Sequence, residues 1–197
     1  MTDDLTVHIA SSEQLTHAYH LRYQVFSEEM KDHRYADHAN RVWRDEDDIP
    51  ASQVVVAIDS SGGVVGTARL TPLRLHKFIG YEVYGFDVLA RLLEISEEEV
   101  RAQVARLDRV VVSKPWRGRR VVHKLVSSVE DLAWNCGSTI VVGVPGAGNR
   151  RSRVTFQRLG YRDYPVSAEY RGFIAQLIYK RLTGPIVAAL SQPDDAA

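Results

Sequence analysis

The chain has 197 residues, of which 45% are hydrophobic and 25% charged, and its formal net charge at pH 7 is zero. This length is enough for one domain with its own core, and the composition excludes a disordered chain. The single cysteine, Cys136, excludes an intramolecular disulfide and a cysteine-rich zinc site. No apolar stretch reaches the roughly 18 residues of a membrane helix, and the first residues lack the basic and apolar regions of a secretory signal. We therefore expect a soluble cytoplasmic protein without a membrane span.

The charge is distributed unevenly along the chain. Residues 28–48 contain eight acidic and four basic residues, whereas residues 101–124 contain eight basic residues and a single acid, Asp108. A second basic run follows, formed by Arg150, Arg151, Arg153, Arg158 and Arg162. Such a surface attracts a polyanionic ligand or an acidic protein partner, although a solvated charged face has the same composition.

The first half of the sequence predicts strands around one helix. Ser11 and Gln14 have the spacing of a capping box, and apolar residues then recur at helical spacing as far as Phe26. In chain order we expect a strand at 5–9, this helix, a polar loop or short helix at 31–50, a strand at 53–58, a turn at 60–63 and a returning strand at 64–70.

The second half predicts a helical insert followed by alternating strands and helices. In chain order we expect an irregular segment at 72–84, helices at 88–93 and 96–104, a strand at 107–113, a helix at 121–134, a strand at 138–144, a helix at 151–159, and strands at 161–166 and 173–179. This order predicts a mixed α/β sheet with helices on both faces. We expect one domain at 1–190 and a disordered tail at 191–197.

The segment at 107–134 is the most informative about function. A strand that ends at Val112 passes through a turn at 117–120, which contains three arginines and Gly118, into a helix. Free N–H groups at a helix N-terminus bind phosphate, glycine permits unusual backbone conformations, and arginines add charge for a diphosphate or phosphodiester. An ordinary strand–helix loop with solvated arginines would have the same sequence.

Two segments together resemble the GNAT superfamily of N-acetyltransferases. Residues 112–120 read Val-Ser-Lys-Pro-Trp-Arg-Gly-Arg-Arg, and the segment that begins at Asn149 ends in Leu159-Gly160-Tyr161. The resemblance implies a mixed, mostly antiparallel central sheet flanked by helices on both faces. It also implies a splayed strand pair that forms the thioester cleft, and a turn at 117–120 that cradles the diphosphate and pantetheine of an acyl-thioester.

The N-terminal third resembles acyl-homoserine-lactone synthases and long-chain N-acyl amino acid synthases, which share this fold. Residues 21–26 read Leu-Arg-Tyr-Gln-Val-Phe, 45–48 read Asp-Glu-Asp-Asp, 66–72 read Gly-Thr-Ala-Arg-Leu-Thr-Pro, and an arginine precedes three valines at 110–112. The resemblance implies a functional set of Arg109, Asp48, Asp45, Arg69 and Arg22. Carboxylates and arginines from separate elements form partly buried ionic networks. Such a network would order residues 31–50 over the acceptor, or would only tie the N-terminal helix to the sheet.

The sequence also departs from these families. Arg120 stands where a Gly or Ala is usual, and Arg106 replaces a Glu of the synthases. A Trp that follows the Phe of the synthase signature is missing, and Tyr35 or Trp43 is a candidate substitute. Phe156 occupies the place of the Tyr that protonates the leaving thiolate. A thiol has a pKa of about 8.5, so the thiolate leaves without much help and this last change does not exclude activity.

Acyl transfer to an amine needs a positioned thioester, a deprotonated amine and a stabilised oxyanion. Backbone N–H groups at 110–112 are candidates for the thioester carbonyl, and Asp108 or Asp48 for the amine proton. Strand alternation places Asp108 and Arg109 on opposite sides. We therefore expect Arg109 to point into the cleft and Asp108 away from it.

These patterns predict an N-acyltransferase that moves an acyl group from an acyl carrier protein or CoA to a primary amine, such as an amino acid or its derivative. The alternatives are a conventional acetyl-CoA-dependent N-acetyltransferase and a catalytically silent fold that binds a thioester or a partner protein. Nucleic-acid binding is a weaker option, because no groove-reading motif occurs. The co-substrate would be acyl-CoA or acyl-phosphopantetheine, with no metal, and an acyl carrier protein is a candidate partner. The candidate donor-binding residues are Val110, Val111, Val112, Arg117, Gly118, Arg119, Arg120 and Asn149.

Overall fold

A computed structural model describes residues 5–75, 85–170 and 173–184. The tail predicted at 191–197, most of the irregular segment predicted at 72–84 and both ends of the domain predicted at 1–190 lie outside these residues. Among the described residues, no helix combines the length and the apolar composition needed to cross a bilayer.

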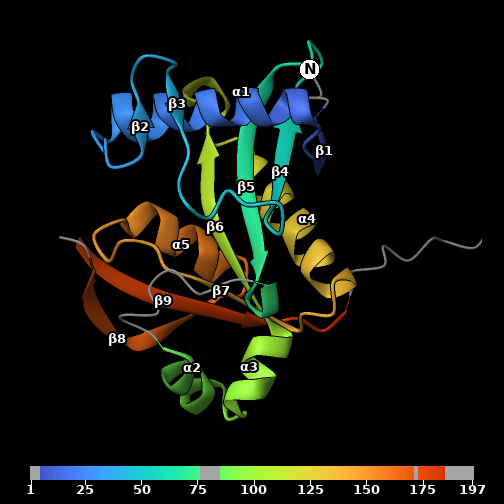
Figure 1. The fold of residues 1–197 in the computed structure, drawn as a ribbon, viewed down its shortest axis with the longest axis vertical. Coiled ribbons are helices and arrows are strands. Elements are labelled where there is room, and N and C mark those ends of the chain that lie inside the picture. The colour runs from blue at the N-terminus through green and yellow to red at the C-terminus, as the bar shows by residue number, and fades with distance from the viewer. Residues whose placement is uncertain (1–4, 76–84, 171–172, 185–197) are drawn as a thin grey trace, which may run out of the picture.

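A seven-stranded sheet forms the centre of the molecule (Figure 1), as the sequence predicts. Its strands lie in the spatial order β1 (Thr6–Ile9), β4 (Gln53–Ile58), β5 (Val64–Pro72), β6 (Val104–Val112), β7 (Ile140–Gly143), β9 (Phe173–Arg181) and β8 (Arg162–Tyr170). All neighbouring strands are antiparallel except β6 and β7, which are parallel. The connection between these two strands passes through α4 (Val121–Asn135), as a parallel crossover requires.

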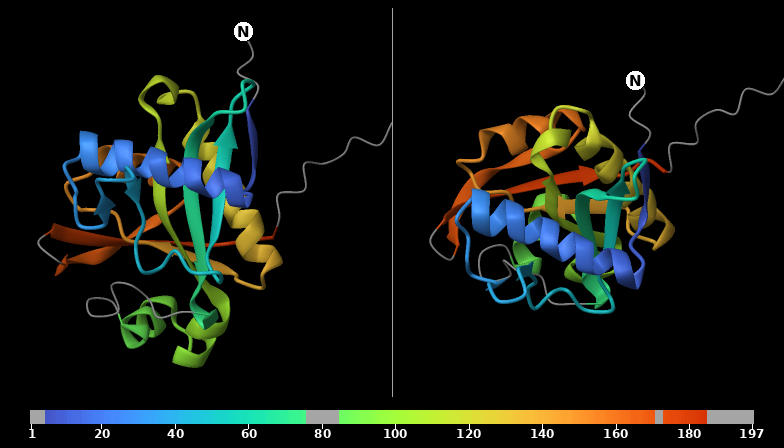
Figure 2. Two further views of the ribbon diagram at one scale, coloured as in Figure 1. Left: turned by 45° about the horizontal axis from the view of Figure 1, so that its top comes forward. Right: turned by 90° about the horizontal axis from the view of Figure 1, so that it is seen from above.

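Helices cover both faces of the sheet, as predicted. α1 (Ser12–Arg22) crosses one face of β4, β5 and β6, and α4 lies on the opposite face (Figures 1 and 2). The predicted insert forms α2 (Phe86–Leu93) and α3 (Glu97–Gln103) at one end of the sheet. α5 (Arg150–Arg158) follows β7 and precedes the β8–β9 hairpin.

The helix starts follow from local side-chain chemistry. The Ser11 side chain accepts from the Gln14 backbone N–H, and the Gln14 side chain accepts from the Ser11 N–H, which is the predicted capping box. Ser96 and Glu99 form a second capping box at α3. α4 is amphipathic and buries residues such as Val121, Leu125 and Val129 against the sheet.

A close backbone approach fixes α4 against β5. A Cβ atom at Gly66 would lie 2.9 Å from Val121 Cγ1 and 3.0 Å from Leu125 Cδ1, so the helix occupies the space that any larger residue would need. The lack of a side chain at Gly66 therefore allows the start of α4 to pack directly on β5.

α1 continues into a π-helical turn at Tyr23–Glu29. Met30 N–H bonds to Val25 C=O, and Asp32 N–H bonds to Phe26 C=O. π-helical turns are rare and are frequent at functional sites. The turn brings the chain to residues 31–50, which form two short paired strands, β2 (Ala36–Asp37) and β3 (Val42–Trp43), and contain no helix.

The two parallel strands separate soon after they pair. Val104–Arg106 of β6 pair with Ile140–Val142 of β7, but β6 continues to Val112 while β7 ends at Gly143. The edge of β6 that faces β7 thus loses its strand partner beyond Arg106. This is the splayed strand pair that the resemblance implies.

Candidate active site

A network of eight charged side chains lies between the α1 face of the sheet and residues 31–50. We call it the Arg–Asp network, and its members are Arg22, Arg69, Arg106, Arg109, Asp45, Asp47, Asp48 and Asp108. It contains all five residues of the predicted functional set, which come from α1, β5, β6 and the segment before β4. The predicted ionic network is therefore confirmed, and it is larger than expected.

Arg69 lies at the centre of the Arg–Asp network. Its Nη1 is 2.5 Å from Asp45 Oδ1 and 3.0 Å from Asp48 Oδ1, and its Nε is 2.8 Å from Asp108 Oδ1. Asp48 Oδ1 is also 2.8 Å from Arg22 Nη1, which ties α1 to the sheet. The four carboxylates balance the four guanidinium groups, so the cluster has no net charge when all its members are ionised.

Arg106 and Asp47 extend the network towards the point where β6 and β7 separate. Arg106 Nη2 lies 2.6 Å from Asp47 Oδ2, and Arg106 Nε lies 3.0 Å from Asp108 Oδ2. The sequence marks Arg106 only as a departure from the synthases, and Asp47 stands unmarked between two predicted acids. Their pairing depends on the path of the chain at 44–48, which no local pattern reveals.

A β-bulge places Asp108 and Arg109 on the same face of β6, so the prediction that they face opposite sides is wrong. The β5–β6 register shifts between Thr67 and Arg69, and Arg109 adopts a φ of 51°. The extra residue reverses the strand alternation, as bulges do. Asp108 bonds to Arg69, while Arg109 Nε donates to Asp45 Oδ2 at 2.7 Å.

Burial distinguishes the members of the network. The side chains of Arg22, Asp48, Asp45 and Arg69 are fully buried, whereas the Arg109 side chain is 20% exposed. Of the five predicted residues, Arg109 is therefore the one whose side chain reaches the surface in this conformation. The buried members hold Arg109 and the chain at 44–48 in place.

The electrostatic environment favours the ionised forms of Asp45 and Asp108. Burial alone would raise the pKa of Asp45, but Arg109 and Arg69 outweigh it and hold this pKa below its ordinary value. Burial opposes ionisation of Asp108 as well, and Arg69 and Arg106 lower its pKa far below the usual range. Carboxylates with such low pKa values are weak proton acceptors.

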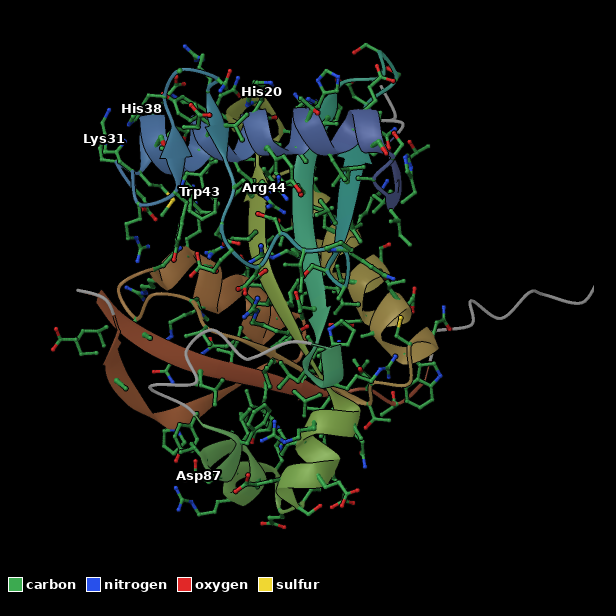
Figure 3. All side chains as sticks on the ribbon, in the orientation of Figure 1. His20, Lys31, His38, Trp43, Arg44 and Asp87 are labelled. Carbon is green, nitrogen blue, oxygen red and sulfur yellow. The ribbon has the colours of Figure 1, made fainter. Side chains whose placement is uncertain are left out.

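A cluster of aromatic rings centred on the buried Trp43 packs against the network. The Arg109 guanidinium lies 4.7 Å from the ring centroid of Trp43, which packs against Phe26 and Tyr35 at 4.5 and 5.2 Å. Both candidate substitutes for the missing Trp thus lie in one cluster with Phe26. In Figure 3, Trp43 and Arg44 lie below α1, whereas His20 and His38 lie near its upper edge.

Side chains of α1 and its π-helical extension anchor the middle of residues 31–50. His20 Nδ1 lies 3.0 Å from Arg41 C=O, and Tyr23 Oη lies 2.9 Å from His38 Nδ1. The segment is therefore held along its length.

The predicted phosphate turn precedes α4. Gly118 has a φ of 83° and Arg120 a φ of 60°, so Arg120 occupies a left-handed conformation that favours glycine. Arg120 is also the N-cap residue of α4 and provides no side-chain cap. Nothing lies within 4 Å of a Cβ placed on Gly118. The first turn of this 15-residue helix contains no acidic residue, which suits an anion.

The other candidate donor-binding residues have defined contacts. Arg117 Nε donates to Val112 C=O at 3.0 Å, and its Nη1 lies 2.7 Å from Glu29 Oε2, so this arginine bridges the turn and the π-helical segment. Arg119 lies 5.1 Å from the Trp116 ring centroid. The bulge turns Val110 and Val112 towards the α4 side and Val111 towards α1.

The segment after β7 is held by Asn149 and Phe156. Asn149 caps α5 by accepting from the Ser152 N–H at 3.1 Å. Phe156 is buried and packs edge-on against Tyr161, at 5.1 Å between ring centroids. Burial raises the pKa of Tyr161 well above its usual value, so its hydroxyl is a poor proton donor to a thiolate.

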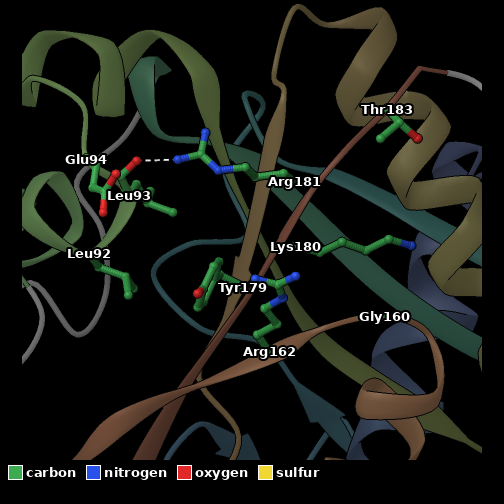
Figure 4. Close-up of a pocket in the computed structure, with 9 residues that line it drawn as sticks. All are labelled: Leu92, Leu93, Glu94, Gly160, Arg162, Tyr179, Lys180, Arg181 and Thr183. Atoms are coloured by element: carbon green, nitrogen blue, oxygen red, sulfur yellow. Dashed lines mark hydrogen bonds between the residues drawn. The ribbon is translucent and has the colours of Figure 1, made fainter.

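A separate groove of about 450 Å³ lies near the end of α2, and no member of the Arg–Asp network or of the turn at 117–120 lines it. Arg162 and Tyr179, which are paired in the β8–β9 register, form one wall with Arg181 (Figure 4). Arg181 donates to the Leu93 carbonyl at the end of α2.

Comparison with known proteins identifies the family. A sequence model described as an acetyltransferase (GNAT) domain matches residues 21–127, which is more than half of the chain. The chain belongs to the GNAT acetyltransferase family. It is thus an acyltransferase, and the match includes the whole Arg–Asp network and the turn before α4. No curated protein sequence matches this GNAT chain.

Solved structures show the same GNAT fold at low sequence identity. The CoA-dependent acyl-homoserine lactone synthase BjaI, with SAM and isopentyl-CoA, is 17% identical with a TM-score of 0.71, over 91% of this chain and 84% of that chain. TofI, in a ternary complex with an inhibitor and MTA, is 19% identical with a TM-score of 0.65, over 90% and 91%. A GNAT acetyltransferase from Staphylococcus aureus Mu50 is 12% identical with a TM-score of 0.59, over 91% and 99%.

Proposed function

We propose that this GNAT protein moves an acyl group from an acyl-thioester to a primary amine, such as an amino acid or its derivative. The observation that carries the proposal is the position of the Arg–Asp network. It holds residues 44–48 beside β6, next to the point where the free edge of this strand begins. Donor and acceptor would then meet at the bulge of β6.

The donor would lie along β6 beyond Arg106. Its phosphates would bind at the N-terminus of α4 and at residues 117–120, where N–H groups and arginines are available. Backbone N–H groups near the bulge would stabilise the developing oxyanion at the thioester carbonyl. The exposed arginines of α5 and of the turn suit CoA or the acidic surface of an acyl carrier protein.

The acceptor would approach from the side of Arg109 and its aromatic neighbours. A carboxylate of the acceptor could pair with the exposed edge of Arg109, which favours an amino acid or a derivative. Because Asp45 and Asp108 are weak proton acceptors and Asp48 is fully buried, we assign removal of the amine proton to solvent. The attack then expels a thiolate, whose proton also comes from solvent.

A donor screen tests the proposal. Acetyl-CoA, a long-chain acyl-CoA and acyl carrier protein loaded with an acyl chain are each offered with a pool of the standard amino acids. Thermal shift, intact mass and release of free thiol are measured. We expect stabilisation by a long-chain donor and release of thiol only with an amine present. Binding of carrier protein that weakens steeply with salt would indicate charged docking.

Two alternatives predict other outcomes. A response to acetyl-CoA alone would identify a conventional N-acetyltransferase. Phe156 motivates the second alternative, because a buried phenyl ring replaces a proton donor. Donor binding without turnover would identify a catalytically silent protein. A cytoplasmic location stays a prediction for a separate experiment.

A further inference from the structure

Asp47 and Arg106 form a pair that the rest of the Arg–Asp network does not need for charge balance. Without them, the network consists of three arginines and three aspartates, namely Arg22, Arg69 and Arg109 with Asp45, Asp48 and Asp108. These six already connect α1, β5 and β6 to the segment before β4. The added pair joins the other six through Arg69, 3.7 Å from Asp47, and through Asp108, 3.0 Å from Arg106, and its position indicates its role.

Arg106 occupies the last position at which β6 pairs with β7, where it lies opposite Val142. Its side chain is 3% exposed, and it reaches Asp47 at 2.6 Å and Asp108 at 3.0 Å. The pair thus fastens residues 44–48 to the point where the two strands separate. Its neighbour Asp108 directly precedes the bulge at Arg109.

The backbone of Asp47 is fixed as firmly as its side chain. Ser52 Oγ donates to Asp47 C=O at 2.7 Å and lies 2.8 Å from Thr71 Oγ1 on β5. Asp47 N–H donates to Asp45 Oδ1 at 3.0 Å. Asp47 therefore has little freedom to move along or away from the sheet.

Burial of an ion pair is a poor way to stabilise a fold. Replacing both partners by apolar residues of similar volume is often neutral or stabilising, because the cost of desolvation offsets the attraction between the charges. An arginine and an aspartate at this position are better explained by the geometry that they impose. A guanidinium fork and a carboxylate fix direction as well as distance.

We propose that Asp47 and Arg106 are positioning residues for acyl transfer. They set the distance between residues 44–48 and the edge of β6 where the thioester would lie. Residues 44–48 include Asp45, which in turn binds Arg109. This inference rests on the proposed function and adds to it the pair that aligns the acceptor with the donor. Neither residue touches the substrate.

The test uses a double substitution that removes both charges at once, Asp47→Leu with Arg106→Met. The control removes a partly buried pair, Lys180 and Glu130, whose side chains meet at 2.7 Å between α4 and β9, as Lys180→Met with Glu130→Leu. Urea unfolding is measured for each protein. Steady-state kinetics use a long-chain acyl-CoA and whichever standard amino acid releases thiol fastest with the wild type.

We expect both double variants to unfold near the urea concentration of the wild type. The Asp47/Arg106 variant should lose about 10²-fold in kcat/KM for the amino acid, because small misplacements of reacting groups have effects of this size. Its KM for acyl-CoA should not change. The control should retain both constants. If the pair only stabilised the fold, a variant as stable as the wild type would also be as active. Wild-type kinetics in a stable Asp47/Arg106 variant would therefore overturn the inference.

The conservative variant Arg106→Lys covers the case in which the double variant does not fold. It keeps the buried charge but loses the guanidinium fork. We expect a raised KM for the amino acid and an unchanged KM for acyl-CoA, whereas unchanged values for both would again overturn the inference. A wild-type protein that transfers no acyl group to any amine would overturn the proposed function as well, so the two failures are distinguishable.

Discussion

Arg109 Nε donates a 2.7 Å hydrogen bond to the Asp45 carboxylate, although 64 residues of sequence separate the two. The same carboxylate accepts from Arg69 Nη1 at 2.5 Å. Asp45 therefore links the partly exposed Arg109 to the fully buried centre of the network. The position of the exposed guanidinium depends on a buried carboxylate from another part of the chain.

Substitution of Arg109 tests its contact with the acceptor. Arg109→Ala should reduce kcat/KM for the amine by about 10²-fold or more, because the acceptor loses its charged partner and its alignment. The protein should remain folded, since Asp45 keeps its contact with Arg69. Thiol release and circular dichroism measure the two effects. Activity that survives in Arg109→Ala would show that the functional set does not transfer from the synthases.

The lowered pKa of Asp45 predicts how stability depends on pH. Its ionised form is favoured in the folded state, so its contribution is fully present above its unfolded pKa of about 3.9 and is lost as pH falls through the lower folded value. Asp45→Asn should reduce the free energy of unfolding by about 3–5 kcal/mol at neutral pH, because it removes a buried carboxylate shared by Arg69 and Arg109 and leaves an excess positive charge in the network. The difference from wild type should shrink in acid below about pH 4.

Urea titrations at neutral pH and in acid measure this difference. A gap that is constant over the whole range would show that Asp45 does not carry the pH dependence. Asp87→Asn is a suitable control, because Asp87 is exposed and pairs with Arg91 on α2 rather than with the network.

Substitution of Gly66 tests the close contact between α4 and β5. Gly66→Ala should reduce the free energy of unfolding by about 1–3 kcal/mol, because its methyl group overlaps Val121 and Leu125 and α4 must move. Gly148→Ala is the matched control, since nothing lies within 4 Å of a Cβ at that position. Equal urea midpoints for the two variants would show that α4 has room to shift.

Substitution of Arg120 tests the backbone conformation and the phosphate binding of the turn before α4. Arg120→Gly and Arg120→Ala both remove the charge, but only glycine relieves the left-handed backbone conformation, so the glycine variant should be the more stable by about 1 kcal/mol. If the arginine binds phosphate, both variants should show a smaller thermal shift with acyl-CoA than wild type. Equal stability of the two variants would contradict the conformation at this residue.

Local patterns predicted most of the fold. Strands rich in valine, the capping box at Ser11 and the helix after Arg120 depend on residues close in sequence, and all are confirmed. β6 begins at Val104, before the predicted start at 107, because α3 ends at Gln103 and the chain enters the sheet at once.

The site was predictable in its members but not in its geometry. The resemblance identified Arg22, Arg69 and Arg109, and the structure places them in one network. Strand alternation could not reveal the bulge, because an extra residue in a strand is defined by its pairing with β5 and not by its own side chain. Asp47 was missed for a related reason. Four consecutive acids at 45–48 leave open which of them points to which arginine.

The parallel β6–β7 pair has a consequence for the order of folding. β6, α4 and β7 are consecutive in the chain, so the donor half assembles from contacts between near neighbours, whereas the Asp47–Arg106 contact spans 59 residues. Closing such a loop costs entropy before its contacts form. We expect substitutions in the network to accelerate unfolding and to leave the refolding rate nearly unchanged, which stopped-flow measurements in urea would show. The contacts of residues 44–48 with the sheet, on the side proposed for the acceptor, would then be the last to form and the first to be lost.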